Sequence, residues 1–136
     1  MNHLIGRMHD VNSFGHMALI WLGNGDKALS LDARQAIEEC ERVYVSPISL
    51  WEMSNKCRKG KLQLKHPPRE WFDIILQRYQ LEILPLTNEV MFLAGELKEH
   101  HKDPADRMII ASAMVNGLAV VTADRNFPLY GISVIC

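Results

Sequence analysis

The stretch that decides the fold runs from Asp103 to Asp124 and reads DPADRMIIASAMVNGLAVVTAD. Its first half opens with Asp103 and Pro104, residue types that begin helices, and it stops at Gly117, a residue type that ends them. Its second half is the continuous apolar run LAVVTA, which is typical of a strand buried on both faces. The stretch therefore predicts a helix through about Asn116, then a buried strand that leads into Asp124.

The same alternation extends in both directions along the chain. The other strand candidates are 43–45, 81–86 and 132–136. The other helix candidates are 31–40, 48–59, 69–79 and 88–101. Apolar strands that alternate with helices predict an α/β fold, with three layers (α/β/α) around a mainly parallel sheet of four or five strands. We expect one domain over residues 1–136, in which the segment 1–14 is a first strand, an extension outside the fold or a non-native remnant.

Composition narrows the class of protein. The 136 residues are 48% hydrophobic with a net charge of −1, so a polyanion would have to be held by a local basic patch or by bound cations. Three cysteines without CxxC spacing, Cys40, Cys57 and Cys136, favour free thiols in a reducing cytoplasm over a disulfide framework or a zinc ribbon. No apolar run approaches the roughly 20 residues of a membrane helix, and the start lacks a signal-peptide pattern.

Three acidic residues lie just beyond predicted strand ends. Asp124 follows the buried strand directly, and Glu52 lies in the helix after the strand 43–45. Asp106 falls in the first turn of its helix, where Asp103 has the position of an N-cap. Each also has a simpler interpretation, namely a turn residue for Asp124, a solvated helix face for Glu52, and helix-start chemistry for Asp103 and Asp106.

All of these acids are expected near the carboxyl ends of strands. In parallel sheets these ends form the crevice in which ligands bind. Carboxylates that converge repel one another unless a cation compensates them. Oxygen ligands without histidine or cysteine at metal spacing indicate Mg²⁺ or Mn²⁺, which activates water and stabilises the charge of a phosphoryl displacement.

From about Ala18 to Ile135 the chain resembles PIN-domain proteins of the VapC toxin type, from toxin–antitoxin pairs. The stretches that carry the resemblance are SLWE with a trailing KGKL, the helix opening HKDPADR, and TADRNF, in this order and spacing. The resemblance implies a PIN-like fold and a metal-dependent endoribonuclease that cuts RNA, often tRNA. It implies metal-site roles for Glu52, Asp106 and Asp124, with Asp103 in support. It further implies a small VapB-like antitoxin as partner and a homodimer.

One departure from the family pattern concerns the first acid. Members usually begin with a short strand that ends in Asp-Thr-His or Asp-x-Asn, but alignment on ALIW puts Gly15, His16 and Met17 at that place. Asp10, in the triplet DVN, has the look of the second variant yet stands several residues too early. We therefore include Asp10 as a candidate fourth ligand. The alternative is a catalytically impaired PIN-fold module that binds antitoxin or RNA without efficient cleavage.

Basic and aromatic residues complete the list of candidates. Candidate RNA contacts, each with an alternative role in helix-end or ion-pair chemistry, are Lys56, Arg58, Lys59, Lys61 and Arg107. The three tryptophans, Trp21, Trp51 and Trp71, stand at apolar helical positions, which favours packing in the core or in a dimer over base stacking.

Overall fold

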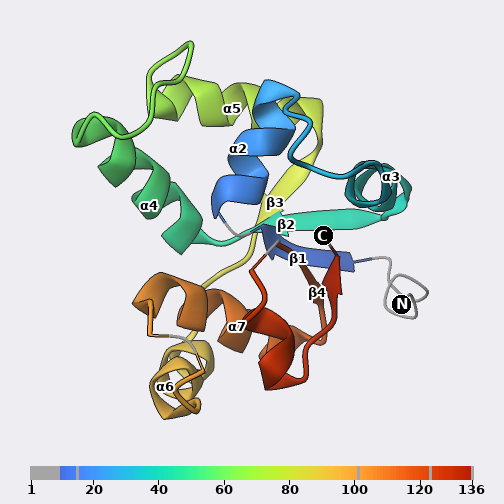
Figure 1. The fold of residues 1–136 in the computed structure, drawn as a ribbon, viewed down its shortest axis with the longest axis vertical. Coiled ribbons are helices and arrows are strands. Elements are labelled where there is room, and N and C mark those ends of the chain that lie inside the picture. The colour runs from blue at the N-terminus through green and yellow to red at the C-terminus, as the bar shows by residue number, and fades with distance from the viewer. Residues whose placement is uncertain (1–9, 15, 101, 123, 136) are drawn as a thin grey trace.

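The computed structural model describes residues 10–14, 16–100, 102–122 and 124–135 (Figure 1). Strands alternate with helices along the chain, as the sequence pattern predicts. The elements in chain order are β1 (Asp10–Phe14), α2 (His16–Asn24), α3 (Leu31–Glu39), β2 (Arg42–Val45), α4 (Pro47–Arg58), α5 (Pro68–Arg78), β3 (Leu81–Ile83), α6 (Asn88–Glu96), α7 (Pro104–Asn116), β4 (Ala119–Val121), the 3-10 helix η1 (Phe127–Tyr130) and β5 (Val134–Ile135).

The strands form one sheet in the order β3-β2-β1-β4-β5, and every pair of neighbours is parallel. In its register, Val43 of β2 lies opposite Leu81 of β3, and Val11 of β1 lies opposite Ala119 of β4. β1 is therefore the central strand, so residues 10–14 belong to the fold. The expected parallel α/β architecture is confirmed, with five strands in the described part of the chain.

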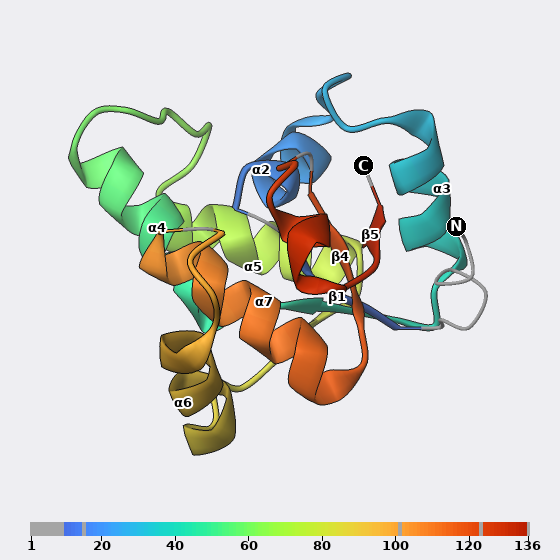
Figure 2. The same ribbon diagram turned by 60° about the horizontal axis from the view of Figure 1, so that its bottom comes forward.

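Helices cover both faces of this sheet (Figures 1 and 2). On one face α2, α3 and α5 pack on β2 and on alternate residues of β4, with Leu19, Val45 and Val121 at most 1% exposed. On the other face α7 packs through Ile109 and Ile110 against Val120. α6 lies outside α7 and packs against it rather than against the sheet. The molecule thus has the three expected layers, with α6 added to one side.

Local signals set several helix ends. Ser30 and Thr87 accept hydrogen bonds from the backbone N–H groups of Ala33 and Val90 at the starts of α3 and α6. Gly117 ends α7 in the left-handed conformation, with φ of 65°.

Two elements are shorter than the sequence predicts. α6 ends at Glu96 rather than near residue 101, because the carbonyls of Leu97 and Lys98 bond to side chains from elsewhere in the chain. β3 ends at Ile83 rather than at residue 86. Leu84 still donates its N–H to the Val45 carbonyl, but Pro85 has no N–H with which to continue the ladder.

The described cysteines, Cys40 and Cys57, are reduced thiols, and Cys136 lies outside the described residues. Burial raises the pKa of the Cys57 thiol, so less of it is ionised at neutral pH than of a solvated thiol. No helix in the described residues is both long enough and apolar enough to span a bilayer.

Candidate functional site

Glu52 reaches the crevice because α4 starts at the carboxyl end of β2. The strand ends at Val45, and Ser46 then caps the helix through its Oγ, which accepts a hydrogen bond from the Ile48 N–H at 3.2 Å. Ser46 is fully buried, and Pro47 supplies the fixed φ of a first helical residue. Glu52 follows in the second turn and is half-buried.

Asp103 and Asp106 stand at the start of α7, which runs antiparallel to the strands and so begins at the same edge of the sheet. The Asp103 Oδ1 accepts hydrogen bonds from the N–H groups of Ala105, at 2.8 Å, and of Asp106, at 3.2 Å. The predicted N-cap is therefore confirmed. Asp103 is exposed and Asp106 is half-buried in the first helical turn.

Asp124 is a turn residue and also follows a buried strand. Its N–H donates to the Thr122 Oγ1 at 3.1 Å, and its Oδ1 accepts from the Asn126 N–H at 2.8 Å. These bonds hold the half-buried carboxylate in a defined place just after β4. The turn interpretation of Asp124 is thus confirmed, and its position directly after β4 is where the sequence predicted a crevice residue.

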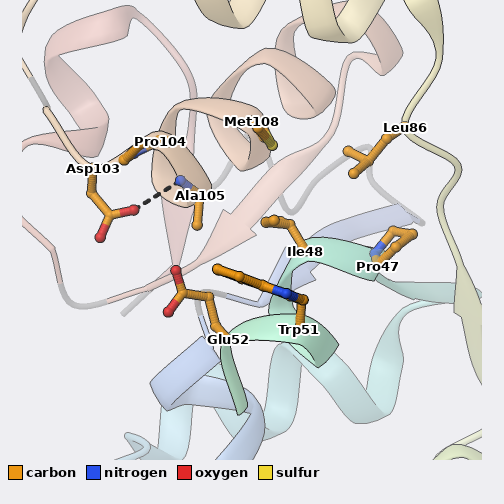
Figure 3. A pocket seen from close by; sticks show the side chains of 9 residues that line it. All are labelled: Pro47, Ile48, Trp51, Glu52, Leu86, Asp103, Pro104, Ala105 and Met108. Carbon is orange, nitrogen blue, oxygen red and sulfur yellow. Dashed lines mark hydrogen bonds between the residues drawn. The ribbon is translucent and has the colours of Figure 1, made fainter. Parts of the chain in front are cut away.

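A pocket of about 590 Å³ opens between the start of α4 and the start of α7. Figure 3 shows the carboxylates of Glu52 and Asp103 on one side of this pocket, pointing toward one another. The rest of the wall is mostly apolar and consists of Pro47, Ile48, Trp51, Leu86, Pro104, Ala105 and Met108.

The structure brings some of the predicted acids together and leaves others apart. Glu52 and Asp103 share the pocket, Asp106 lies one turn along α7 from Asp103, and Asp124 lies on the segment after β4. Within the described ranges, no three acidic, histidine or cysteine side chains are grouped closely enough to hold one metal ion. The donor type suits Mg²⁺ or Mn²⁺, but a shared cation requires these carboxylates to draw closer.

Asp10 lies at the opposite end of its strand from the crevice. It is the first residue of β1, whose carboxyl end is Phe14. At a rise of about 3.3 Å per residue this separation is about 13 Å along the strand. The backbone position gives no support to Asp10 as the fourth ligand.

Arg107 is engaged inside the protein. Its Nε donates to the Ala94 carbonyl at 3.0 Å, its Nη1 to Lys98 at 3.1 Å and its Nη2 to Leu97 at 2.6 Å. The sequence did not indicate this binding to the end of α6, and the binding tests neither of the two interpretations, an ion pair or a phosphate contact. By contrast Arg58, Lys59 and Lys61 are exposed beyond the crevice, and Lys56 is half-buried.

The apolar wall of the pocket was missed from the sequence, because all three tryptophans stand at similar helical positions. Trp71 is 4% exposed in the core and Trp21 packs against the same core, but Trp51 is 59% exposed. The signal in the sequence is that Trp51 directly precedes Glu52, and both residues line the pocket.

Known proteins resemble this chain in sequence and in fold. The PIN-domain family profile matches residues 17–132. Ribonuclease VapC22 of Mycobacterium tuberculosis is 32% identical over 111 residues, which are 81% of this chain and 83% of that protein.

Two solved structures share the fold at lower sequence identity. VapBC2 from Rickettsia felis, bound to a DNA fragment from its promoter, superposes with a TM-score of 0.70 at 19% identity, covering 92% of this chain and 97% of that one. DNA-bound VapBC from Salmonella typhimurium superposes with a TM-score of 0.63 at 20% identity, and the match covers 92% of this chain and 98% of that one. The chain therefore belongs to the PIN-domain family, as a relative of the VapC ribonucleases.

Proposed function

We propose that this protein is a Mg²⁺- or Mn²⁺-dependent endoribonuclease, the toxin of a type II toxin–antitoxin pair. The observation that carries the proposal is the pair of carboxylates, Glu52 and Asp103, that face one another in a pocket at the carboxyl edge of the sheet. The relationship to a VapC ribonuclease supports the same activity.

In this proposal Glu52, Asp106 and Asp124 hold the cation, and Asp103 supports them. When bound, the cation supplies a water of lowered pKa and neutralises charge on the scissile phosphate. The chain's own contribution in this proposal is position, since Glu52 stands on α4, Asp106 in the first turn of α7 and Asp124 in the turn after β4. Asp106 stands in the first turn of α7, where the helix dipole favours negative charge.

A small antitoxin is the proposed protein partner. The solved relatives from Rickettsia felis and Salmonella typhimurium are VapBC proteins. The pocket here suits a peptide that combines apolar side chains with a basic residue, because Trp51, Ile48 and Met108 form its wall and two acids stand at its edge. We expect Trp51→Ala to weaken capture of a cognate antitoxin peptide in calorimetry, whereas Trp21→Phe leaves it unchanged.

We propose that the substrate is RNA and that tRNA is among the RNAs that are cut. To bind RNA phosphates beside these acids, the protein needs basic side chains. Lys56, Arg58, Lys59 and Lys61 supply them at the end of α4 and beyond it. A homodimer is the proposed assembly, and the exposed Met91 and Phe92 on α6, 43% and 73% exposed, support it. Sedimentation of wild type against Phe92→Ser tests the dimer.

The decisive experiment is RNA cleavage by the pure protein with Mg²⁺ or Mn²⁺. Glu52→Gln and Asp124→Asn should each reduce cleavage at least a hundredfold, because each removes one charge of the proposed site while preserving shape. Glu38→Gln and Asp73→Asn remove the same charges from exposed positions on α3 and α5 and should leave cleavage unchanged. Cleavage that survives both site substitutions rules the proposal out.

The impaired module remains the second candidate, and a specific observation favours it. No acid stands at the carboxyl end of β1, since the strand ends in Phe14 and the following residues are Gly15, His16 and Met17. Calorimetry with Mn²⁺ separates the two candidates. Tight antitoxin binding without measurable Mn²⁺ binding would favour the impaired module over the nuclease.

A further inference from the structure

The segment that leaves α6 is bound by side chains from two other elements. Arg107 of α7 donates three hydrogen bonds to this segment, from separate nitrogens to the carbonyls of Ala94, Leu97 and Lys98. These carbonyls lie at the end of α6 or just beyond it, where a helix leaves acceptors unsatisfied and where positive charge complements the dipole. Arg107 thereby fixes the end of one helix to the first turn of the next.

Tyr130, from the 3-10 helix η1, contacts the same segment. Its hydroxyl donates to the Lys98 carbonyl at 2.6 Å, and its ring meets the His100 ring edge-on at a centroid distance of 5.1 Å. Tyr130 ends η1, which starts at the buried Phe127. The Phe127 N–H donates to the Asp124 carbonyl at 3.4 Å, so η1 and the Asp124 turn form one continuous unit.

The Lys98 carbonyl is therefore a shared acceptor for two site-bearing units. Arg107 directly follows Asp106, and Tyr130 belongs to the unit that carries Asp124. We propose that Arg107 and Tyr130 are positioning residues that fix the Asp106 and Asp124 segments relative to one another through the 97–100 segment. This inference rests on the proposed nuclease function, since it assigns a role in holding the same acids.

The geometry favours a positioning role for Arg107 over RNA binding. Three of the five guanidinium N–H groups already donate to backbone carbonyls, which holds the side chain against the end of α6. Lysine keeps the charge but cannot reproduce a planar fork of donors directed at three acceptors. Arg107→Lys should therefore be intermediate between wild type and Arg107→Gln.

The test compares Arg107→Gln, Arg107→Lys and Tyr130→Phe with two matched controls. Arg78→Gln removes an exposed arginine from α5, and Tyr79→Phe removes a hydroxyl that donates to the Leu22 carbonyl on the other side of the sheet. RNA cleavage is measured per folded molecule, with urea unfolding used to set the folded fraction.

For Arg107→Gln we expect kcat to fall about tenfold or more with KM within about twofold of wild type. Tyr130→Phe should lower kcat about threefold, and the controls should stay within twofold. The combined variant should lose less than the product of the single losses, because both side chains act on one carbonyl. The salt dependence of RNA binding should not change.

If the wild-type protein cleaves RNA, either of two outcomes would overturn the positioning role. A higher KM with a salt slope lowered by about 0.7 would make Arg107 a phosphate contact. Lost stability with normal kcat in the folded fraction would make it merely structural.

If the wild-type protein cleaves no RNA, the proposed nuclease function is wrong, but the positioning role can still be tested. The measurement is then hydrogen exchange of backbone amides. Arg107→Gln should then speed exchange of the Ala105 and Asp106 amides at least tenfold relative to Arg78→Gln. Unchanged exchange would refute the positioning role.

Discussion

Replacing Asp103 by Asn and by Ala separates its capping role from its charge. The Oδ1 of Asp103 accepts two backbone hydrogen bonds at the start of α7, and the same carboxylate faces Glu52 in the pocket. Asparagine keeps an oxygen that accepts these bonds but removes the charge. Alanine removes both, so the two variants should differ in stability but resemble each other in any effect that depends on charge.

The magnitudes follow from these contacts. Loss of an N-cap acceptor costs about 1 kcal/mol of unfolding free energy. Loss of charge at a helix start costs about 0.3 kcal/mol here, at the lower end of the usual range, because Asp103 is exposed and screened by solvent. Asp103→Ala should therefore lose roughly 1.3 kcal/mol, and Asp103→Asn roughly 0.3 kcal/mol.

Urea unfolding followed by circular dichroism measures the stability part, and RNA cleavage per folded molecule measures the charge part. We expect cleavage to fall threefold to tenfold in both variants, or about 0.6–1.4 kcal/mol in the barrier, because each weakens the attraction of the pocket for a cation. Ser30→Ala removes a matching cap from α3 and should cost about 1 kcal/mol without changing cleavage.

Two results would refute this reasoning. Equal destabilisation by Asn and Ala would mean that the cap bonds do not stabilise α7. Wild-type cleavage by Asp103→Asn would mean that the charge facing Glu52 has no part in the reaction.

Three further predictions concern packing, charge and pH. Gly23→Ala should destabilise by about 1–3 kcal/mol in urea unfolding, because a Cβ would come within 2.2 Å of Trp71 Cζ2, whereas Gly95→Ala, with nothing within 4 Å, should stabilise by about 0.5–1 kcal/mol. Lys59→Ala should lower the slope of log affinity for single-stranded RNA against log salt by about 0.7, and an unchanged slope would exclude a phosphate contact. Because burial raises the pKa of the Cys57 thiol, this thiol ionises in the unfolded chain at a lower pH than in the folded protein. The stability that the buried neutral thiol contributes should therefore be lost as pH rises above about 9. Urea unfolding at several pH values measures this loss, and Cys57→Ala should make the stability depend less on pH.

The parts of the fold that local chemistry controls could be predicted from the sequence. Asp103 and Gly117 bound α7 as expected, and the apolar run before Asp124 is a buried parallel strand. The end of α6 could not be predicted, because its last carbonyls bond to Arg107 and Tyr130, which lie far away along the chain. Such long-range hydrogen bonds leave no periodic trace in a sequence.

For the candidate site, the sequence predicted the edge of the sheet at which it lies. The sequence did not predict which side chains face one another there. Parallel topology puts the starts of α4 and α7 at one edge, and Glu52, Asp103 and Asp106 stand there. Which carboxylates face one another depends on how the helices pack, and the exposure of Trp51 depends on the same packing.

The claim that one divalent cation is shared by the crevice acids is tested most directly by anomalous scattering from a crystal soaked in Mn²⁺. We predict a single peak within about 2.0–2.3 Å of carboxylate oxygens from Glu52, Asp106 and Asp124. Fully ordered carboxylates with no manganese peak between them would contradict the account.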